Sequence, residues 1–338
     1  MSHSERNHVD ASLSRRQFIR RMAVLGMGAA AAGSLFSLLS CAQSDSSVPI
    51  QSPQPEPAPK DLPDTGPAQP ASHLVIARGQ DTAGLVEAAL GPLGGIERFV
   101  KPGNDVIIKP NICVAYHSYE YAATTNPEVV ATLVRLSLEA GAKKVRVMDS
   151  PFGGTAEQAY ERSGIGEAVR AAGGEMEVMS PFKFKMTEIP EGLDIKSWPV
   201  YCDALDTDVL INVPIAKHHS LGRLTLGMKN LMGLILERNK FHFNLGQRIA
   251  DLTSLIRPDL TVIDAVRILT NHGPTGGDLN DVKITNTVIA GTDVIAADSY
   301  AATLFGLSGA DIPAIRAGAA MGLGTMNLED IKIEEIAV

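Results

Sequence analysis

Short apolar runs alternate with longer amphipathic segments over residues 73–338. The short runs are rich in β-branched residues and predict buried strands, whereas the longer segments repeat apolar residues at helical spacing. The predicted strands are 74–77, 105–108, 144–148, 175–179, 209–213, 260–263, 287–290 and 331–336. The predicted helices are 82–100, 127–141, 155–163, 166–172, 245–256, 294–305 and 312–321, and a further helical segment starts near Thr225. This alternation predicts an α/β fold, with a largely parallel sheet covered by helices on both faces.

One segment breaks the alternation. Residues 182–208 contain Pro190 and Pro199 among short alternating pieces, and this pattern is typical of a hairpin. Such a hairpin would either cap a cleft or separate two lobes, 73–203 and 204–338. Both arrangements stay open from the sequence.

Residues 1–41 have the pattern of a bacterial export signal. Arg15 and Arg16 form a twin-arginine motif, and an apolar run rich in Ala and Gly follows at 22–39. The run ends in a sequence that resembles a lipobox, with Cys41 as the residue that would carry lipid. We therefore expect the twin-arginine export machinery as a partner and a lipid anchor at Cys41. Ordinary cleavage nearby, which would release the protein, is the alternative.

Residues 42–72 are rich in Pro, Ser, Gln and Asp. A segment of this composition cannot bury enough apolar surface to fold, and we expect an extended tether. The export signal and the tether together predict a lipoprotein on the periplasmic or cell-surface face of a membrane. The folded domain is then expected over 73–338.

Composition excludes some classes of function. The chain has 30 basic and 38 acidic residues, a formal net charge of −8, and no basic run after the signal, so we expect no nucleic-acid partner. Apart from Cys41, its cysteines are Cys113 and Cys202. Two thiols cannot ligate an iron–sulfur cluster, and this chain alone is expected to bind none. A disulfide between them and two buried thiols are both compatible with the sequence.

Polar residues cluster where the predicted strands end. Lys217 lies beyond the strand at 209–213, Lys229 and Asn230 lie in the helical segment that follows, and Lys109 and Asn111 end an earlier strand. Parallel strands present their carboxyl ends at one edge of a sheet, where ligands bind. We expect the three lysines to hold a small anion and the two asparagines to orient it. The alternative for each lysine is a solvated surface position.

Histidines and aspartates supply the candidate chemistry. His218 is expected to act as acid/base or ligand donor, and the aspartates at or just after strand ends, Asp264 and Asp298, are expected to support it. A divalent metal would find candidate ligands in His218, His242 and His272. Structural hydrogen bonding is the alternative for all of them.

Several nucleotide and hydrolase motifs do not occur. The glycine-rich loop 271–278 lacks the Lys-Ser/Thr ending of a P-loop, no G-x-G-x-x-G follows the first strand, and no G-x-S-x-G elbow is present. These observations disfavour a nucleotide cofactor and a serine hydrolase. We include Gly276 of this loop among the expected ligand-binding positions.

The motifs together resemble the domain of unknown function 362 family. The resemblance spans nearly all of 73–338. It is carried by Ile107-Ile108-Lys109-Pro110-Asn111, Thr125-Asn126-Pro127-Glu128, Asp149-Ser150-Pro151, Asn212-Val213-Pro214, Gly227-Met228-Lys229-Asn230, Gly273-Pro274 and Thr292-Asp293. Some family members resemble fusions to a ferredoxin-like module with cysteine-ligated clusters, and this chain lacks those cysteines.

Two hypotheses of function follow. The first is an exported, membrane-tethered protein that binds a small anionic ligand, with or without a metal, and does chemistry on it. The second is a non-catalytic binding or assembly module for a periplasmic redox or metal-handling partner, which the family's association with cluster-bearing modules suggests. The sequence does not identify a substrate or a reaction.

Overall fold

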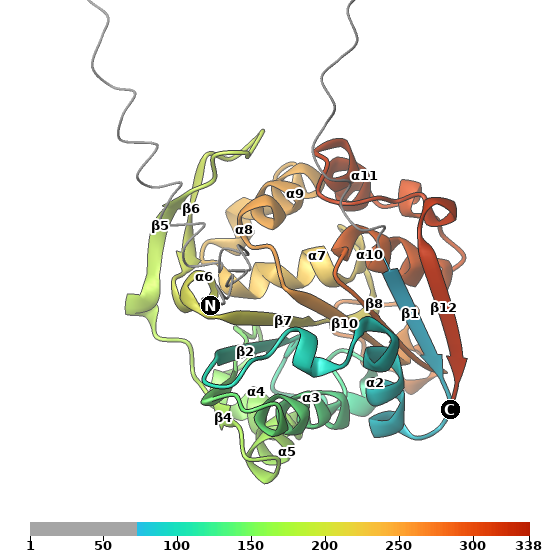
Figure 1. Ribbon diagram of the computed structural model, residues 1–338. Coiled ribbons are helices and arrows are strands. Elements are labelled where there is room, and N and C mark those ends of the chain that lie inside the picture. Colours follow the sequence, from blue (N-terminus) through green and yellow to red (C-terminus); the bar gives the residue numbers. More distant parts are fainter. Residues whose placement is uncertain (1–72) are drawn as a thin grey trace, which may run out of the picture. The chain divides into compact units, whose positions relative to one another are not determined.

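A sheet of mostly parallel strands forms the centre of the computed structural model, which describes residues 73–338 (Figure 1). The expected signal at 1–41, with Cys41, and the expected tether at 42–72 lie outside the described residues. The strands follow the order β12-β1-β11-β10-β7-β2-β3-β4. Their bounds are β1 (His73–Arg78), β2 (Asp105–Pro110), β3 (Lys144–Val147), β4 (Glu175–Met176), β7 (Val209–Val213), β10 (Leu260–Leu269), β11 (Val282–Gly291) and β12 (Lys332–Ala337). Along this path only β11 runs antiparallel to its neighbours, so the largely parallel α/β prediction is confirmed.

Helices cover both faces of the sheet (Figure 1). One layer contains α2 (Thr82–Leu90), α3 (Pro127–Glu139), α4 (Ala156–Arg162) and α5 (Ile165–Ala171), and the other contains α7 (Gly227–Asn230), α9 (Leu245–Leu255), α10 (Val294–Thr303) and α11 (Pro313–Ala320). Successive strand residues point to opposite faces. In β1, Val75 and Ala77 therefore pack under the first layer, while Leu74 and Ile76 pack under the second. None of the helices over 73–338 combines the length and apolar character that crossing a bilayer requires.

Capping residues fix where two of these helices begin. The Asn126 side chain accepts a 3.0 Å hydrogen bond from the Glu128 amide, and Pro127 occupies the first position of α3. The Asp293 carboxylate accepts from the Ala296 amide at 3.0 Å and caps α10. Both helix starts are those predicted from the sequence.

The predicted hairpin is present. Strands β5 (Phe184–Glu188) and β6 (Ser197–Tyr201) form a separate antiparallel pair, followed by the short helix α6 (Asp203–Asp206). Strand β7, which comes next, pairs with β2 and with β10 in the central sheet. The segments 73–203 and 204–338 thus share one sheet, and the described part of the chain does not divide between them.

An ion-pair network anchors the base of the hairpin. The buried Arg146 side chain on β3 contacts Asp105 at 2.9 Å, Glu177 at 3.0 Å and Asp203 at 2.5 Å. Lys183 contacts the same two carboxylates, Glu177 at 2.9 Å and Asp203 at 2.8 Å.

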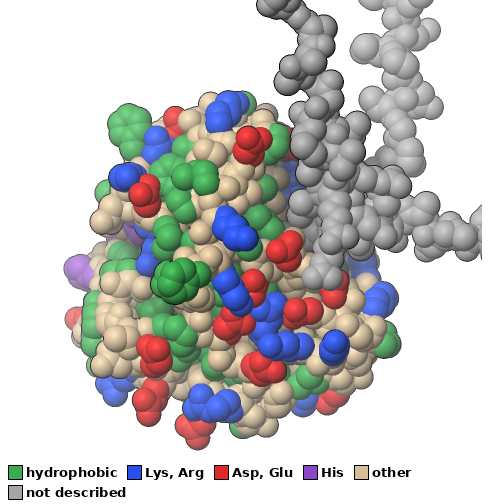
Figure 2. Space-filling view, turned by 90° about the vertical axis from the view of Figure 1, so that its left-hand side faces the viewer, with side chains coloured by type: hydrophobic (Ala, Val, Ile, Leu, Met, Phe, Trp, Pro, Cys, Tyr) green, Lys and Arg blue, Asp and Glu red, His purple; other side chains and the backbone are tan. Residues whose placement is uncertain are grey.

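On the face shown in Figure 2, acidic and basic side chains are interspersed, and neither sign forms a patch of its own.

One local prediction is wrong. Pro214 ends the predicted strand at 209–213, and a strand end there would leave 215–219 in a loop, yet these residues form a further strand, β8 (Ile215–His219). Strand β10 continues well beyond the end of β7, and its outer half offers backbone groups with which β8 pairs. A short antiparallel partner, β9 (Arg223–Thr225), borders β8 on the other side. The helical segment expected from Thr225 is one turn, α7, continued by the 3-10 helix Leu231–Leu234.

Candidate functional site

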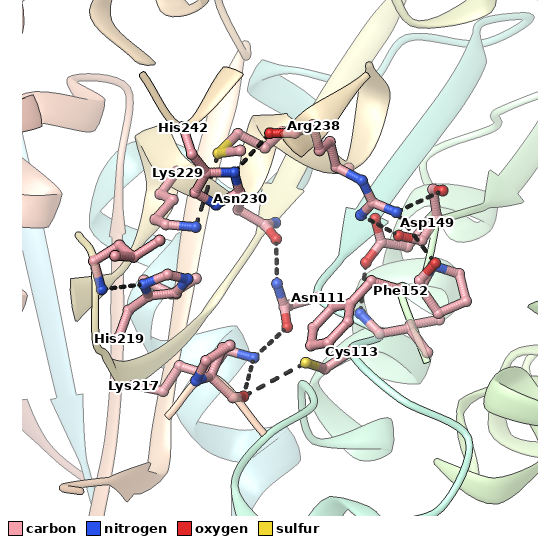
Figure 3. A pocket seen from close by; sticks show the side chains of 18 of the residues that line it. Asn111, Cys113, Asp149, Phe152, Lys217, His219, Lys229, Asn230, Arg238 and His242 are labelled. Carbon is pink, nitrogen blue, oxygen red and sulfur yellow. Dashed lines mark hydrogen bonds between the residues drawn. The ribbon is translucent and has the colours of Figure 1, made fainter. Parts of the chain in front are cut away.

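A cavity of about 850 Å³ opens at the carboxyl edge of β2, β3 and β8 (Figure 3). Helix α7, the short helix α8 (Arg238–Phe241) and the loop after β3 complete its walls. Six of the side chains expected at the site line it, namely Lys109, Asn111, Lys217, Lys229, Asn230 and His242. Lys109 and His242, the first and last of these residues along the chain, are more than 130 positions apart, so the fold brings distant segments together.

Lys109 forms a buried ion pair on the cavity floor. Its Nζ lies 2.7 Å from Oδ1 of Asp149, and the two side chains are 0% and 4% exposed. The same ammonium also donates to the Pro110 carbonyl at 2.8 Å and to Oδ1 of Asn230 at 3.3 Å. Burial lowers the pKa of Lys109, and the charge of Asp149 opposes this shift. With three oxygen acceptors in place, Lys109 has no N–H group left for a ligand.

Gly233 packs directly against this ion pair. A Cβ atom at this position would lie 2.0 Å from Oδ1 of Asp149 and 2.6 Å from Nζ of Lys109. Only glycine fits without moving the pair. The glycine thus allows the 3-10 helix after α7 to approach the ends of β2 and β3.

Lys217 also has all of its hydrogen-bond donors occupied by the protein. Its Nζ donates to Oδ1 of Asn111 at 2.9 Å and to the carbonyls of Ala123 and Pro274 at 2.6 and 3.0 Å. Asn111 in turn donates to Oδ1 of Asn230 at 3.0 Å. The amides and this lysine form a continuous row along the cavity, and they hold its shape (Figure 3).

Lys229 differs from the other two lysines. The hydrogen-bond partner of its Nζ is the Met232 thioether sulfur at 3.8 Å, a weak acceptor. The described part of the chain gives it no carboxylate partner. Burial, and then the charge of Lys217, lowers the pKa of Lys229 to about 7, and Arg238 adds to the effect. This amine therefore loses its proton far more readily than an ordinary lysine side chain does.

Two imidazoles near Lys229 have opposite tautomers. Nδ1 of His219 accepts from the amides of Leu221 and Gly222 at 3.1 and 3.2 Å, so the proton of the neutral ring is on Nε2. Nδ1 of His242 lies 2.6 Å from the Arg238 carbonyl, which can only accept, so Nε2 of that ring carries the lone pair. The ring centroids are 6.4 Å apart.

The two imidazoles stay neutral at physiological pH. Burial, together with the charges of Lys229 and Lys217, lowers the pKa of His219 to about 3. Burial also lowers the pKa of His242. One ring can therefore donate a hydrogen bond into the cavity while the other can accept a proton.

Arg238 is a second cation on the cavity wall, and no carboxylate of residues 73–338 pairs with it. Its guanidinium donates to the Ser150 carbonyl at 2.8 Å, the Pro151 carbonyl at 3.2 Å and the Ser150 hydroxyl at 3.4 Å, and none of these contacts balances its charge. The neighbouring Lys240, by contrast, pairs with Glu237 at 3.1 Å and is largely exposed.

Asp264 and Asp298 lie behind the cavity wall rather than on it. Asp264 accepts from the amides of Asn126 and Val266 at 2.7 and 3.0 Å, and burial raises its pKa to about 6. Asp298 accepts from the first two amides of α7, and burial raises its pKa to about 7. Asp298 thereby holds the backbone of α7, which carries Lys229 and Asn230. Asp298 borders a second cavity, of about 310 Å³, to which Lys229 and His242 also contribute.

Three other expected site residues lie off the cavity. His218 points to the opposite side of β8 from His219, and its Nδ1 accepts from the Gly273 amide at 3.1 Å. His272 has a 69% exposed side chain and contacts Asp281 at 2.7 Å. Gly276 sits against Leu269 in its loop, with φ +63°. Over residues 73–338, no three His, Cys, Asp or Glu side chains gather in a way that could hold a metal ion.

The sequence pattern favoured His218 over the adjacent His219 and gave no signal for Arg238. In a strand, residues two apart share a face, so Lys217 and His219 point together into the cavity and His218 points away. A strand at 215–219 would therefore have favoured His219. The two cysteines of residues 73–338 are free thiols, with Cys113 on the cavity wall and Cys202 apart from it.

Comparisons with known proteins place the chain in a family. The family model described as domain of unknown function (DUF362) matches residues 106–303. A thylakoid-associated protein of Synechocystis sp. is 31% identical over 249 residues, which cover 69% of this chain and 73% of that protein.

Two solved structures show weaker similarity. The lactate racemase apoprotein of Thermoanaerobacterium thermosaccharolyticum matches with a TM-score of 0.42 and 12% identity, over 65% of this chain and 54% of that chain. A Thermotoga maritima protein from a structural genomics consortium matches with a TM-score of 0.43 and 14% identity, over 66% of this chain and 59% of that chain. The chain thus spans a little over half the length of these solved chains. On the family model and the Synechocystis relative, the chain belongs to the DUF362 family.

Proposed function

We propose that the cavity binds a small organic anion between Lys229 and Arg238 and that the protein does chemistry on it. The observation that carries this proposal is the pair of cations on the cavity wall whose charges no carboxylate of the described residues balances. Their contacts are a thioether, carbonyls and a hydroxyl. An anionic ligand would supply the missing counter-charge.

The charge balance of the wall supports the proposal. The lining contains five cations, Lys109, Lys217, Lys229, Arg238 and Lys240, and two carboxylates, Asp149 and Glu237. Each carboxylate is already paired, Asp149 with Lys109 and Glu237 with Lys240. A charge that is removed from water costs free energy unless an opposite charge pairs with it. A bound anion would pair with these cations, and removing this cost would favour binding.

The other walls favour an organic ligand over a bare inorganic ion. Ile112, Phe152 and Met232 give the cavity apolar surface beside its cations. Small-molecule sites characteristically combine an apolar lining with a few placed polar groups. A short carboxylic acid fits this combination, with its carboxylate at Arg238 and its remaining groups toward Lys229 and the two imidazoles.

Replacing Lys229 by methionine is expected to weaken binding of malonate about 10- to 100-fold, because a hydrogen bond to a charged group contributes roughly 1.5–3 kcal/mol. Isothermal titration calorimetry at pH 6.5 measures the change. Lys240→Met is the matched control, since it removes the same charge from the same cavity at an exposed, already paired side chain. Equal losses in the two variants would point to a general charge effect and contradict the role assigned to Lys229.

Binding of malonate to the wild-type protein is expected to weaken as the pH rises above about 7. The free protein holds the pKa of Lys229 at about 7, while a bound anion favours its protonated form. Above that pH a proton must be taken up with the ligand, and Kd rises about tenfold per pH unit. The same titrations with Lys229→Met are expected to show a flatter profile. Parallel profiles would mean that another group titrates.

Native mass spectrometry with elemental analysis of the exported protein would test the wider setting. It would report the lipid at Cys41, any divalent metal and any bound small molecule. We expect a lipid-anchored protein with a small acid bound. A stoichiometric protein partner without a small molecule would instead favour an assembly role beside a redox or metal-handling protein.

A further inference from the structure

We infer that Lys229 is a nucleophilic amine that condenses with the carbonyl group of a small oxo acid, because its Nζ faces the cavity with a thioether as its hydrogen-bond partner and lies near two imidazoles of opposite tautomer. This inference rests on the proposed anion site and deepens it, since Arg238 would hold the carboxylate of the same molecule. The substrate class is then 2-oxo acids and related carbonyl acids.

The contrast among the three lysines singles out Lys229. An amine attacks a carbonyl carbon through its nitrogen lone pair, so it must first lose a proton. Nζ of Lys109 and Nζ of Lys217 each donate to three oxygen acceptors of the protein, so neither nitrogen is free to approach a carbonyl carbon. Lys229 has no oxygen acceptor in the described structure, and its low pKa of about 7 leaves a large neutral fraction at neutral pH.

The imidazoles provide the proton transfers that such a condensation needs. The Nε2–H of His219 can donate to the carbonyl oxygen as negative charge develops on it. Nε2 of His242 can accept the proton that the amine nitrogen releases. Both tautomers are set by backbone groups, the amides of Leu221 and Gly222 for His219 and the Arg238 carbonyl for His242. Figure 3 shows both rings beside Lys229 on one side of the cavity.

The reaction balances without an oxidant or reductant. The lone pair of Nζ forms a bond to the carbonyl carbon, and the C=O π pair moves to oxygen, where the Nε2–H of His219 hydrogen-bonds to the negative charge. Nζ gives one proton to Nε2 of His242, which passes it to this oxygen, and a neutral carbinolamine results. Nζ gives its second proton by the same route, the nitrogen lone pair forms the C=N bond, and the oxygen departs as water with both protons of the original amine. The products are an imine at Lys229 and one water molecule.

Reductive trapping tests the inference. The full chain is incubated at pH 7 with pyruvate and sodium cyanoborohydride, which reduces an imine to a stable secondary amine, and the product is mapped by peptide mass spectrometry. We expect one adduct per chain, at Lys229. Lys229→Arg, which keeps a cation but lacks a comparably nucleophilic amine, is expected to lose the adduct, and Lys240→Met is expected to retain it.

The outcomes separate this inference from the proposed anion site. If the wild-type protein binds malonate but pyruvate labels no lysine, or labels exposed lysines while Lys229 stays unmodified, the nucleophile assignment fails and the anion site stands. If malonate does not bind, the anion site fails, and an adduct at Lys229 would then support the amine chemistry alone. If malonate does not bind and no adduct forms at Lys229, both are overturned.

Discussion

Replacing Asp149 by asparagine is expected to lower the free energy of unfolding by about 3–5 kcal/mol, the range found when one partner of a buried ion pair is removed. Asp149 lies 2.7 Å from the Lys109 ammonium, with both side chains almost fully buried. Without the carboxylate, the cation keeps only neutral acceptors in a desolvated position. Urea denaturation at neutral pH measures the change.

Two further variants isolate the cause of this loss. Glu191 and Arg257 form a surface pair of the same length, 2.7 Å, with both side chains more than half exposed. Glu191→Gln is therefore expected to cost less than about 1 kcal/mol. The double variant Lys109→Met with Asp149→Asn removes both buried charges and is expected to be more stable than Asp149→Asn alone. If the double variant is the less stable of the two, an uncompensated charge is not the cause.

The sequence could predict that Lys109, Asn111 and Lys217 lie close together, because the strand topology alone places them at one edge of the sheet. Lys109 and Asn111 lie at the carboxyl end of β2, and Lys217 lies beyond β7, which is the direct neighbour of β2 in the sheet. Parallel neighbours end at the same edge, so residues at their ends meet whatever the details of packing. The two helix starts could be predicted because the contacts that fix them are local. Asn126 and Asp293 each accept a hydrogen bond from an amide within the next turn of the chain.

The different roles of the three lysines could not be predicted. Lys109 owes its pairing to Asp149, forty residues later, and Lys217 owes two of its acceptors to the carbonyls of Ala123 and Pro274. Every residue has a backbone carbonyl, so the sequence does not show which carbonyls will accept a hydrogen bond from a lysine. A sequence therefore indicates that lysines converge, but the contacts that leave Lys229 without an oxygen acceptor appear only in the folded chain.

Whether His218 or His219 faces the cavity depends on whether residues 215–219 form a strand. Side chains alternate along a strand but not along an irregular loop. The sequence pattern ended the strand at Pro214, so it gave no reason to choose His219 over His218. The added strand β8 depends on the outer half of β10, which is a tertiary contact.

Replacing Asp298 by alanine is expected to lower the free energy of unfolding by roughly 2–6 kcal/mol, because two buried amides lose their acceptor at about 1–3 kcal/mol each. The carboxylate accepts from Gly227 at 2.6 Å and from Met228 at 2.9 Å. These amides begin the turn that presents Lys229. The folded fraction of the variant is therefore also expected to bind malonate more weakly. Denaturation and calorimetry on one sample measure both effects.

The isosteric variant Asp298→Asn separates shape from charge through the pH dependence of stability. Burial raises the pKa of Asp298 from 3.8 to about 7, so the folded protein binds this proton more tightly than the unfolded chain does. The contribution of this group to stability is therefore full below about pH 4 and is lost as the pH rises toward 7. Asparagine cannot ionise, and its deficit relative to the wild type is expected to shrink over that interval. A deficit that grows with pH would mean that the ionised carboxylate is the stabilising form, and that its two amide contacts outweigh its desolvation.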